Sequence, residues 1–300
     1  MKAFDYYRPS TYNEAFALLS TPGRAMMPLA GGTDLIPHVR DDAWKPDGVV
    51  DIKGLPGLRE LGTVEHQPCC GMGSGACLRV GAAMRMNEIG RSELVRSSWE
   101  ALAEAAAAMG NEQVRNRATL GGNMGTASPA GDSLPALLVL EATVLVNGPE
   151  GERCVLATEF FLGPGRTRLR QSEIITGVLI PQPPTGARGT YEKLSRRKAG
   201  DLSIVSVAAA AVPTEGRLCW RIALGAVAPT PIRAPQAEAV LNHSTTPEAI
   251  AEAARLAFNC CSPIDDIRAS AEYRHAMVIE LVQRAVQTVL TRLEPQRAPK

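Results

Sequence analysis

Two glycine pairs constrain this chain more than any other feature of its sequence. Gly31-Gly32 lies in AGGTD and Gly121-Gly122 in ATLGGN, both in the first half of the chain. A glycine accepts positive φ and lacks the β-carbon that would keep a ligand's phosphate away from the backbone. Successive unpaired amides in such a turn form a nest that binds anions. Each pair alone is typical of an ordinary turn, but two nests together suit a diphosphate.

Other nucleotide and hydrolase motifs are poorly supported. The stretch GMGSGA (71–76) has the letters of a dinucleotide-binding turn, but HQPCC before it is no buried strand. The following LRVGAAM predicts a strand, where that motif needs a helix. The sequence contains no phosphate-loop, G-x-S-x-G or HExxH motif, and its four histidines are scattered. We therefore expect no catalytic residue and no histidine-based metal site in this chain.

Composition and charge exclude several partner classes. The net charge of +1 gives no electrostatic reason to expect nucleic acid or an anionic membrane. No apolar run approaches the ~18 residues of a membrane-spanning helix, and the start does not resemble a secretory signal. Seven cysteines, an odd number, favour the reduced cytoplasm. Cys69, Cys70 and Cys77 show no CxxC spacing, so a metal site there is disfavoured, as it is at Cys260-Cys261.

The order of elements predicts an α+β protein with more than one unit. Three hundred residues exceed the usual size of a single core. Short strands and helices alternate in the first half, and the pattern changes near residues 181–189. Beyond that point LSIVSVAAAAVPTEGRLCWRIALGAVA predicts a hairpin that turns at TEGR. Three helices follow, so we expect antiparallel strands with helices on one face.

Local signals mark several helix ends. Ser10 or Thr11 is expected to cap the first helix, and Thr246 with Pro247 predicts another helix start. The stretch from Ser92 to Gly110 predicts one continuous helix, because its apolar residues fall on one face.

Longer passages carry a family resemblance. AGGTD and ATLGGN, in this order, resemble the two flavin-binding loops in the medium subunit of molybdenum hydroxylases such as bacterial xanthine dehydrogenase and carbon monoxide dehydrogenase. VRNRATLGGNMGTASPAGDSLPALLVL, FFLGPGRTRLRQSEIITGVLIP, YEKLSRRKAGDLSIVSVAAA and ALGAVAPTPIRAPQAEA resemble further passages of that family. The resemblance covers essentially the whole chain. No cysteine-rich insert follows the second glycine loop, which disfavours the extra four-iron cluster of one branch.

The resemblance implies a fold and its domain limits. A two-lobed α+β FAD-binding domain of the vanillyl-alcohol-oxidase/PCMH type would span 1–183, with lobes at about 1–57 and 58–183. A smaller C-terminal α+β domain of the CO dehydrogenase flavoprotein type would span 188–300.

The resemblance also implies a function. This chain would carry FAD, and a small partner subunit with 2Fe-2S clusters would supply electrons. A large molybdopterin subunit would oxidise the substrate, as in xanthine dehydrogenase. NAD+ or another acceptor would receive the electrons. Two alternatives remain open: a stand-alone flavin oxidoreductase with its own small-molecule substrate, and a flavin-binding assembly module that transfers no electrons.

The resemblance finally implies a set of cofactor-binding residues. These comprise the two loops and four further positions: Met27, Pro28, Leu29, Ala30, Gly31, Gly32, Thr33, Asp34, Ala118, Thr119, Leu120, Gly121, Gly122, Asn123, Asp132, Ile174, Glu192 and Lys193. Asp132 matches an acidic position near the adenosine half, and Lys193 matches a lysine by the flavin ring. Each has a plainer interpretation: Asp132 equally suits a helix cap, Lys193 a solvated charge, and Ile174 a core residue.

Overall fold

The chain forms two compact units, and neither is continuous in sequence. The computed structural model describes residues 2–66 and 75–294. The first unit comprises Met1–Glu88, Glu112–Ala127 and Ala142–Pro181; the second comprises Ile89–Asn111, Ser128–Glu141 and Gln182–Lys300. The limits 1–183 and 188–300 remain a prediction, since these units follow spatial proximity and not chain order. Among the described residues, none of the helices is long and apolar enough to cross a membrane.

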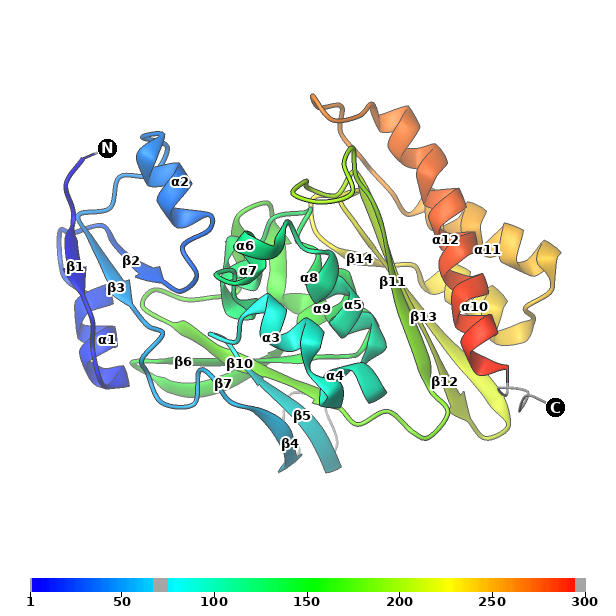
Figure 1. The fold of residues 1–300 in the computed structure, drawn as a ribbon, viewed down its shortest axis with the longest axis horizontal. Coiled ribbons are helices and arrows are strands. Elements are labelled where there is room, and N and C mark those ends of the chain that lie inside the picture. The colour runs from blue at the N-terminus through cyan, green and yellow to red at the C-terminus, as the bar shows by residue number, and fades with distance from the viewer. Residues whose placement is uncertain (1, 67–74, 295–300) are drawn as a thin grey trace. The chain divides into compact units, whose positions relative to one another are not determined.

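A small parallel sheet begins the first unit (Figure 1). Its strands lie in the order β1-β3-β2, and all pair in parallel. They are β1 (Asp5–Tyr7), β2 (Met26–Leu29) and β3 (Gly48–Asp51). Thr11 caps the helix between β1 and β2 and forms a capping box with Glu14, so the predicted helix start is confirmed.

A five-stranded antiparallel sheet forms the rest of the first unit's framework, in the order β4-β5-β10-β6-β7. Its strands are β4 (Leu61–His66), β5 (Gly75–Gly81), β6 (Thr143–Gly148), β7 (Gly151–Leu156) and β10 (Ile174–Pro181). The minor elements of the unit are α1 (Tyr12–Leu19), α2 (Leu35–Arg40), α6 (Glu112–Arg115), α7 (Leu120–Thr126), α9 (Ala157–Phe160), β8 (Phe161–Gly163) and β9 (Arg166–Thr167). The chain passes into the second unit through α3 (Met86–Arg91).

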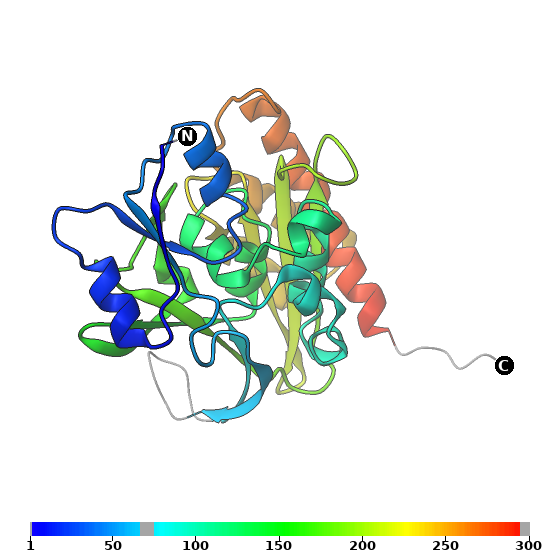
Figure 2. The same cartoon turned by 60° about the vertical axis from the view of Figure 1, so that its left-hand side comes forward.

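The second unit is built on a four-stranded antiparallel sheet in the order β11-β12-β13-β14. Its strands are β11 (Arg188–Leu194), β12 (Val205–Thr214), β13 (Arg217–Gly225) and β14 (Ile232–Arg233). Its helices are α4 (Glu93–Ser98), α5 (Glu100–Ala108), α8 (Ser133–Val139), α10 (Pro235–His243), α11 (Pro247–Asn259) and α12 (Ala271–Leu293). In Figure 2, α12 runs alongside the strands of this sheet.

Helices cover both faces of this sheet, which corrects the prediction of helices on one face. Val207 and Ala209 of β12 belong to the core that α10, α11 and α12 complete. Successive residues of a strand point to opposite faces, so Ser206 faces the other way. Its Oγ lies beside Gly225, which also contacts Pro135 of α8. The second layer comes from α5 and α8, earlier in the chain than the strands that they cover.

Two further local predictions have different outcomes. The hairpin at TEGR is confirmed: Thr214 pairs with Arg217, and both turn residues have positive φ, as a tight two-residue turn requires. The prediction of a single helix from Ser92 to Gly110 is wrong. It breaks into α4 and α5 at Trp99, which is fully buried and has φ −122° and ψ 52°. The non-helical conformation at the break coincides with complete burial of the indole.

Candidate functional site

The first glycine loop leaves backbone amides unpaired. Residues 30–34 connect the carboxyl end of β2 to α2, and Gly32 has φ +76°, where a side chain would be strained. Among the described residues, the amides from Gly31 to Asp34 donate to no acceptor. All four residues are half-exposed. The predicted nest is therefore present in this loop, at the carboxyl edge of the parallel sheet.

The second glycine loop differs, because its amides are already paired. Thr119 caps α7, and its Oγ1 accepts from the amide of Gly122 at 3.2 Å. The amide of Leu120 donates to Met84 O, and that of Gly121 donates to Ala82 O at 2.8 Å. The expectation of a second nest is wrong, because the residues that follow β5, together with Thr119, take up these donors.

Glycine at 121 instead permits close backbone contact. A β-carbon built on Gly121 would lie 2.6 Å from Ala82 Cβ and 2.9 Å from Ala82 O. Its helix, α7 (LGGNMGT), holds three glycines, although each costs about 1 kcal/mol relative to alanine inside a helix. Close approach accounts for Gly121, where the α7 backbone lies against the residues that follow β5.

The two loops lie directly against each other within the first unit. A β-carbon on Gly31 would lie 2.3 Å from the carbonyl oxygen of Arg117. The Thr126 hydroxyl donates to Asp34 Oδ2 at 3.1 Å and ties the end of α7 to the start of α2. The structure therefore brings together residues 27–34 and 118–123. Ile174 belongs to the same unit: it is buried at the start of β10, the strand on which α7 packs.

Asp132 and Lys193 form a buried ion pair in the second unit. Lys193 Nζ donates to Asp132 Oδ2 at 2.9 Å, and both side chains are less than a tenth exposed. The same ammonium donates to Ala108 O and to Asp201 O. This arrangement corrects two plainer interpretations. Asp132 occupies the position before α8 but makes no capping hydrogen bond, and Lys193 is not a solvated charge.

Two residues that sequence reasoning missed complete this cluster. Tyr191 and Ser203 donate hydroxyl hydrogen bonds to Asp132 Oδ1, at 2.7 Å and 2.6 Å. Burial, together with the neighbouring Asp132 carboxylate, raises the pKa of Tyr191 well above its ordinary value. Tyr191 stands two residues before Lys193 on the same strand, and side chains at that spacing point to the same face. This spacing is the sequence signal that could have placed Tyr191 beside Lys193.

Glu192 points away from this cluster. Its carboxylate lies 4.0 Å from the Arg284 guanidinium of α12. Burial raises the pKa of Glu192, and Arg284 opposes that shift. Glu192, Lys193 and Asp132 thus belong to the second unit, whereas the glycine loops belong to the first.

The cysteines form no centre among the described residues. Cys77, Cys154, Cys219, Cys260 and Cys261 make no disulfide. In the part of the chain described, no three His, Cys, Asp or Glu side chains are grouped to hold a metal ion. The predictions about Cys69 and Cys70, and about most of GMGSGA, concern residues outside the described ranges. The part of that motif that is described belongs to β5, a strand where a dinucleotide-binding motif needs a helix.

Comparison with known proteins assigns the class of protein. A family model for the FAD binding domain in molybdopterin dehydrogenase matches residues 2–183. A second family model, for the CO dehydrogenase flavoprotein C-terminal domain, matches residues 190–289. The chain is therefore an FAD-binding oxidoreductase subunit with the α+β fold predicted from its sequence.

Individual relatives match over nearly their full length. The carbon monoxide dehydrogenase medium chain of Hydrogenophaga pseudoflava is 33% identical, over 96% of this chain and 98% of the relative. A putative xanthine dehydrogenase FAD-binding subunit of Escherichia coli K12 is 31% identical, over 94% of each. The solved carbon monoxide dehydrogenase from Hydrogenophaga pseudoflava superimposes with a TM-score of 0.89 at 35% identity, covering 97% of this chain and 98% of that one. This chain belongs to the FAD-binding medium subunits of the molybdenum hydroxylase family.

Two of the three glycines in α7 provide a test of close packing. Gly121→Ala is expected to lower the free energy of unfolding by about 1–3 kcal/mol, since its β-carbon collides with Ala82. Gly125→Ala is the matched control, because its nearest neighbour, Ile175 Cδ1, lies at 3.8 Å. That variant is expected to raise stability by up to about 1 kcal/mol through helix propensity. Urea unfolding of the FAD-free chain measures both, and equal effects would contradict the packing role.

The buried ion pair provides a second test. Lys193→Met leaves the Asp132 carboxylate buried without its cation, so we expect a loss of about 3 kcal/mol in the free energy of unfolding. Lys198→Met is the control, because Lys198 is exposed and surface changes stay within about 0.5 kcal/mol. The measurement is urea unfolding followed by circular dichroism. A Lys193→Met variant as stable as the control would show that the pair contributes nothing.

Proposed function

We propose that this chain is the FAD-carrying electron-transfer subunit of a three-subunit molybdenum hydroxylase. A small subunit with 2Fe-2S clusters supplies the electrons, and NAD+ or another acceptor receives them. A large molybdopterin subunit oxidises the substrate. The observation that carries the proposal is the row of unpaired amides at Gly31–Asp34, held against α7 in a chain that matches medium subunits from end to end.

The first glycine loop fits the diphosphate of FAD. Four successive amides donate to no acceptor within the described parts of the chain, and positive φ at Gly32 allows the bend that exposes them. Such a concave row of N–H groups binds anions without a basic side chain. Gly31–Asp34 therefore hold the phosphates in this proposal, while Thr33 supplies a hydroxyl donor.

The second loop has a different part in the proposal. With its first amides paired, α7 serves as the wall against which the first loop is fixed. Gly122 and Asn123 are half-exposed, and a β-carbon on Gly122 would come 3.9 Å from Ala30 Cβ. We place them at the border of the cofactor, with Ala118, Thr119 and Leu120 behind them in the core.

The chain's own residues position the cofactor and do no covalent chemistry. When bound, FAD supplies the exchange between single electrons and electron pairs. Lys193 already directs its ammonium at Asp132, Ala108 O and Asp201 O. It therefore fixes the segment after β11 in place. Contact of Lys193, Glu192, Asp132 and Ile174 with the flavin or adenosine stays a prediction of the resemblance.

The substrate is assigned only to a class. The names of relatives with similar identity include both carbon monoxide and xanthine, so a xanthine dehydrogenase-like activity is one proposal within the family. Substrate choice belongs to the molybdopterin subunit in this scheme. The cytoplasmic setting favoured by the cysteine content is part of the same proposal.

Reconstitution tests the proposed function directly. The purified chain is expected to bind FAD, turn yellow and remain inert alone toward small substrates. Joined to its 2Fe-2S subunit and the molybdopterin subunit, it is expected to show flavin bleaching when the substrate is added. Substrate turnover by the isolated chain would support the stand-alone oxidoreductase instead. Flavin that is never reduced in the full complex would support the assembly module.

Two glycines with positive φ test the amide nest. Gly32→Ala strains the loop and brings a β-carbon to 3.2 Å from Leu29 Cδ1, so the amides shift. We expect the Kd for FAD to rise by about tenfold or more. Gly23→Ala is the control, because Gly23 has φ +70° and open space around it. It carries the same strain away from the nest and is expected to leave the Kd unchanged. Equal FAD affinity in both variants would refute the nest.

A further inference from the structure

Asp34 places a carboxylate at the end of the row of unpaired amides. The residue is half-exposed and belongs to the same compact unit as the rest of the first glycine loop, α2 and α7. A carboxylate beside a bound diphosphate is unfavourable, because like charges repel and the repulsion grows as water is displaced. Unless its carboxylate has another task, Asp34 weakens the site in which it lies.

Capping of α2 is not that task. An aspartate at the start of a helix ordinarily accepts a hydrogen bond from an amide in the first turn. Asp34 stands at the N-cap position of α2, but its backbone is helical (φ −104°, ψ −47°) and its side chain makes no such bond. Only its backbone carbonyl serves the helix, where it accepts from the amide of His38 at 3.1 Å. The side-chain oxygens of Asp34 therefore have their partners outside α2.

Thr126, the last residue of α7, holds one of these oxygens. Its hydroxyl donates to Asp34 Oδ2 at 3.1 Å, and the two residues are 92 positions apart in the sequence. Within the described parts of the chain, no donor reaches Asp34 Oδ1. An ionised carboxylate has room for about four hydrogen bonds. A carboxylate that is fixed at one oxygen keeps the other in place for a donor on a ligand.

A hydroxyl group next to a phosphate is the ligand chemistry that suits Asp34 Oδ1. Phosphate oxygens cannot supply the donor, because a diphosphate in FAD carries acceptors only. Hydroxyl groups flank that diphosphate on both sides, on the ribose of the adenosine and on the ribityl chain of the flavin. An acidic side chain that accepts from a sugar hydroxyl beside a backbone-held phosphate also occurs in dinucleotide-binding folds. Hydrogen bonds to a charged acceptor are among the strong ones, so this contact offsets the repulsion.

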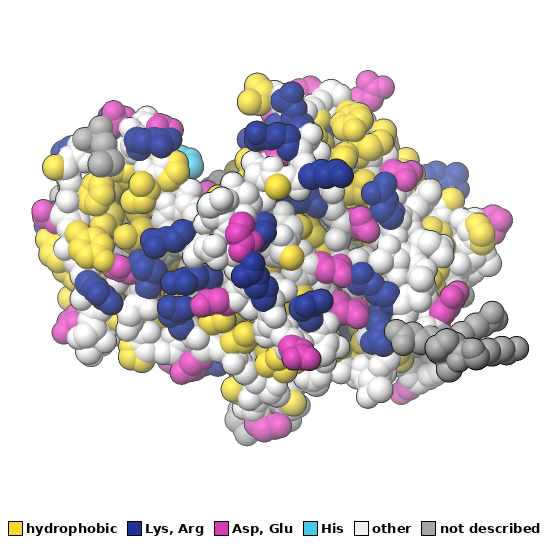
Figure 3. Space-filling view, viewed as in Figure 1, with side chains coloured by type: hydrophobic (Ala, Val, Ile, Leu, Met, Phe, Trp, Pro, Cys, Tyr) yellow, Lys and Arg dark blue, Asp and Glu magenta, His cyan; other side chains and the backbone are white. Residues whose placement is uncertain are grey.

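Long-range charge does not select the ligand in place of such a contact. The chain carries 32 Lys and Arg residues and 31 Asp and Glu residues. Figure 3 shows side chains of both signs interspersed over the face in view. A mixed surface of this kind creates no strong field of one sign. The affinity for FAD therefore depends on contacts at the loop itself, where the removal of one carboxylate has a measurable effect.

We propose that Asp34 Oδ1 accepts a sugar hydroxyl of FAD, and that Thr126 is the positioning residue that orients this carboxylate. The inference rests on the proposed function, because the diphosphate occupies the amide nest there. Thr126 lies outside the set of cofactor-binding residues that the family resemblance implies. The amides of Gly31–Asp34 recognise the diphosphate, and the pair of Asp34 and Thr126 recognises the sugar attached to it. The loop thereby selects a nucleotide over an inorganic anion.

Titration of the FAD-free chain with FAD and with inorganic pyrophosphate tests the role of Asp34. Asp34→Leu keeps the branched shape but removes the acceptor, so the Kd for FAD is expected to rise by about tenfold or more. Pyrophosphate has no sugar, and its Kd, measured by competition with FAD, is expected to stay constant or fall as a negative charge is lost. Asp41→Leu is the matched control, because Asp41 is exposed at the other end of α2. It is expected to leave both constants unchanged.

Thr126→Val tests the positioning role, because it removes only the hydroxyl. The Kd for FAD is expected to rise by about threefold or more, whereas that for pyrophosphate stays constant. In the double variant with Asp34→Leu, the valine is expected to add nothing, since a double-mutant cycle reports the coupling of two residues in contact. Thr21→Val is the control: its hydroxyl donates to Leu18 O, ahead of β2 and away from the nest.

The two halves of the cofactor locate the hydroxyl. Weaker binding of ADP to Asp34→Leu assigns it to the ribose, and weaker binding of FMN assigns it to the ribityl chain. The proposal is overturned if Asp34→Leu binds FAD equally well or more tightly, or if neither half binds more weakly. Equal losses for FAD and pyrophosphate, or additive effects in the double variant, overturn it too. Failure of the proposed function shows separately, as an unsubstituted chain that takes up no FAD or whose FAD pyrophosphate does not displace.

Discussion

The close approach of Gly31 to the carbonyl of Arg117 is the contact on which the candidate site depends. Any β-carbon there would lie 2.3 Å from that oxygen, so only glycine lets the loop after β2 rest on the backbone that leads into α7. The contact joins two stretches that are far apart in the sequence. It fixes the loop while leaving its amides unused, and a bound anion needs such fixed, unpaired donors. Gly121 makes a similar close contact, in which the backbone of α7 lies against the residue after β5.

The polar groups discussed above differ in whether the protein itself supplies their hydrogen-bond partners. Nearly all buried backbone donors in proteins are paired, and the amides at the start of α7 follow that rule. The Asp132 carboxylate follows it too, with three donors from Tyr191, Lys193 and Ser203. The amides at Gly31–Asp34 depart from it in a half-exposed loop. Paired groups hold the structure together, whereas this unpaired row is free for a ligand.

Sequence alone predicted the features that depend on neighbouring residues. The cap at Thr246 and the hairpin turn at Glu215-Gly216 are local rules of backbone geometry, and both are confirmed. The break at Trp99 was missed because apolar periodicity says nothing about the burial of one indole by distant residues. The amide of Gly121 was expected to be bare because its acceptor, Ala82, belongs to another element of the chain. Such long-range pairing decides which glycine loop presents donors and which one only packs.

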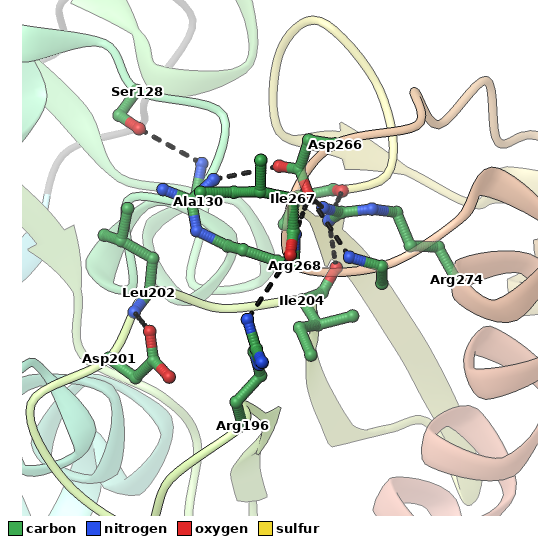
Figure 4. Close-up of polar contacts among 12 residues, drawn as sticks. Ser128, Ala130, Arg196, Asp201, Leu202, Ile204, Asp266, Ile267, Arg268 and Arg274 are labelled. Atoms are coloured by element: carbon green, nitrogen blue, oxygen red, sulfur yellow. Dashed lines mark hydrogen bonds and ion pairs between the residues drawn. The ribbon is translucent and has the colours of Figure 1, made fainter.

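The loop at 262–270 exposes Ile264 and Ile267 next to a buried arginine, Arg274 (Figure 4). A loop that merely connects two helices has no need of a buried arginine beneath it, and burying Arg274 is costly unless its charge is paired. The pairing with Asp266 resolves that cost and holds the loop's backbone in one shape. In a chain whose redox chemistry belongs to a bound cofactor, the protein's own contribution is to place that cofactor and the electron donor. Under the proposed function, the unpaired amides at Gly31–Asp34 accomplish the first of these tasks.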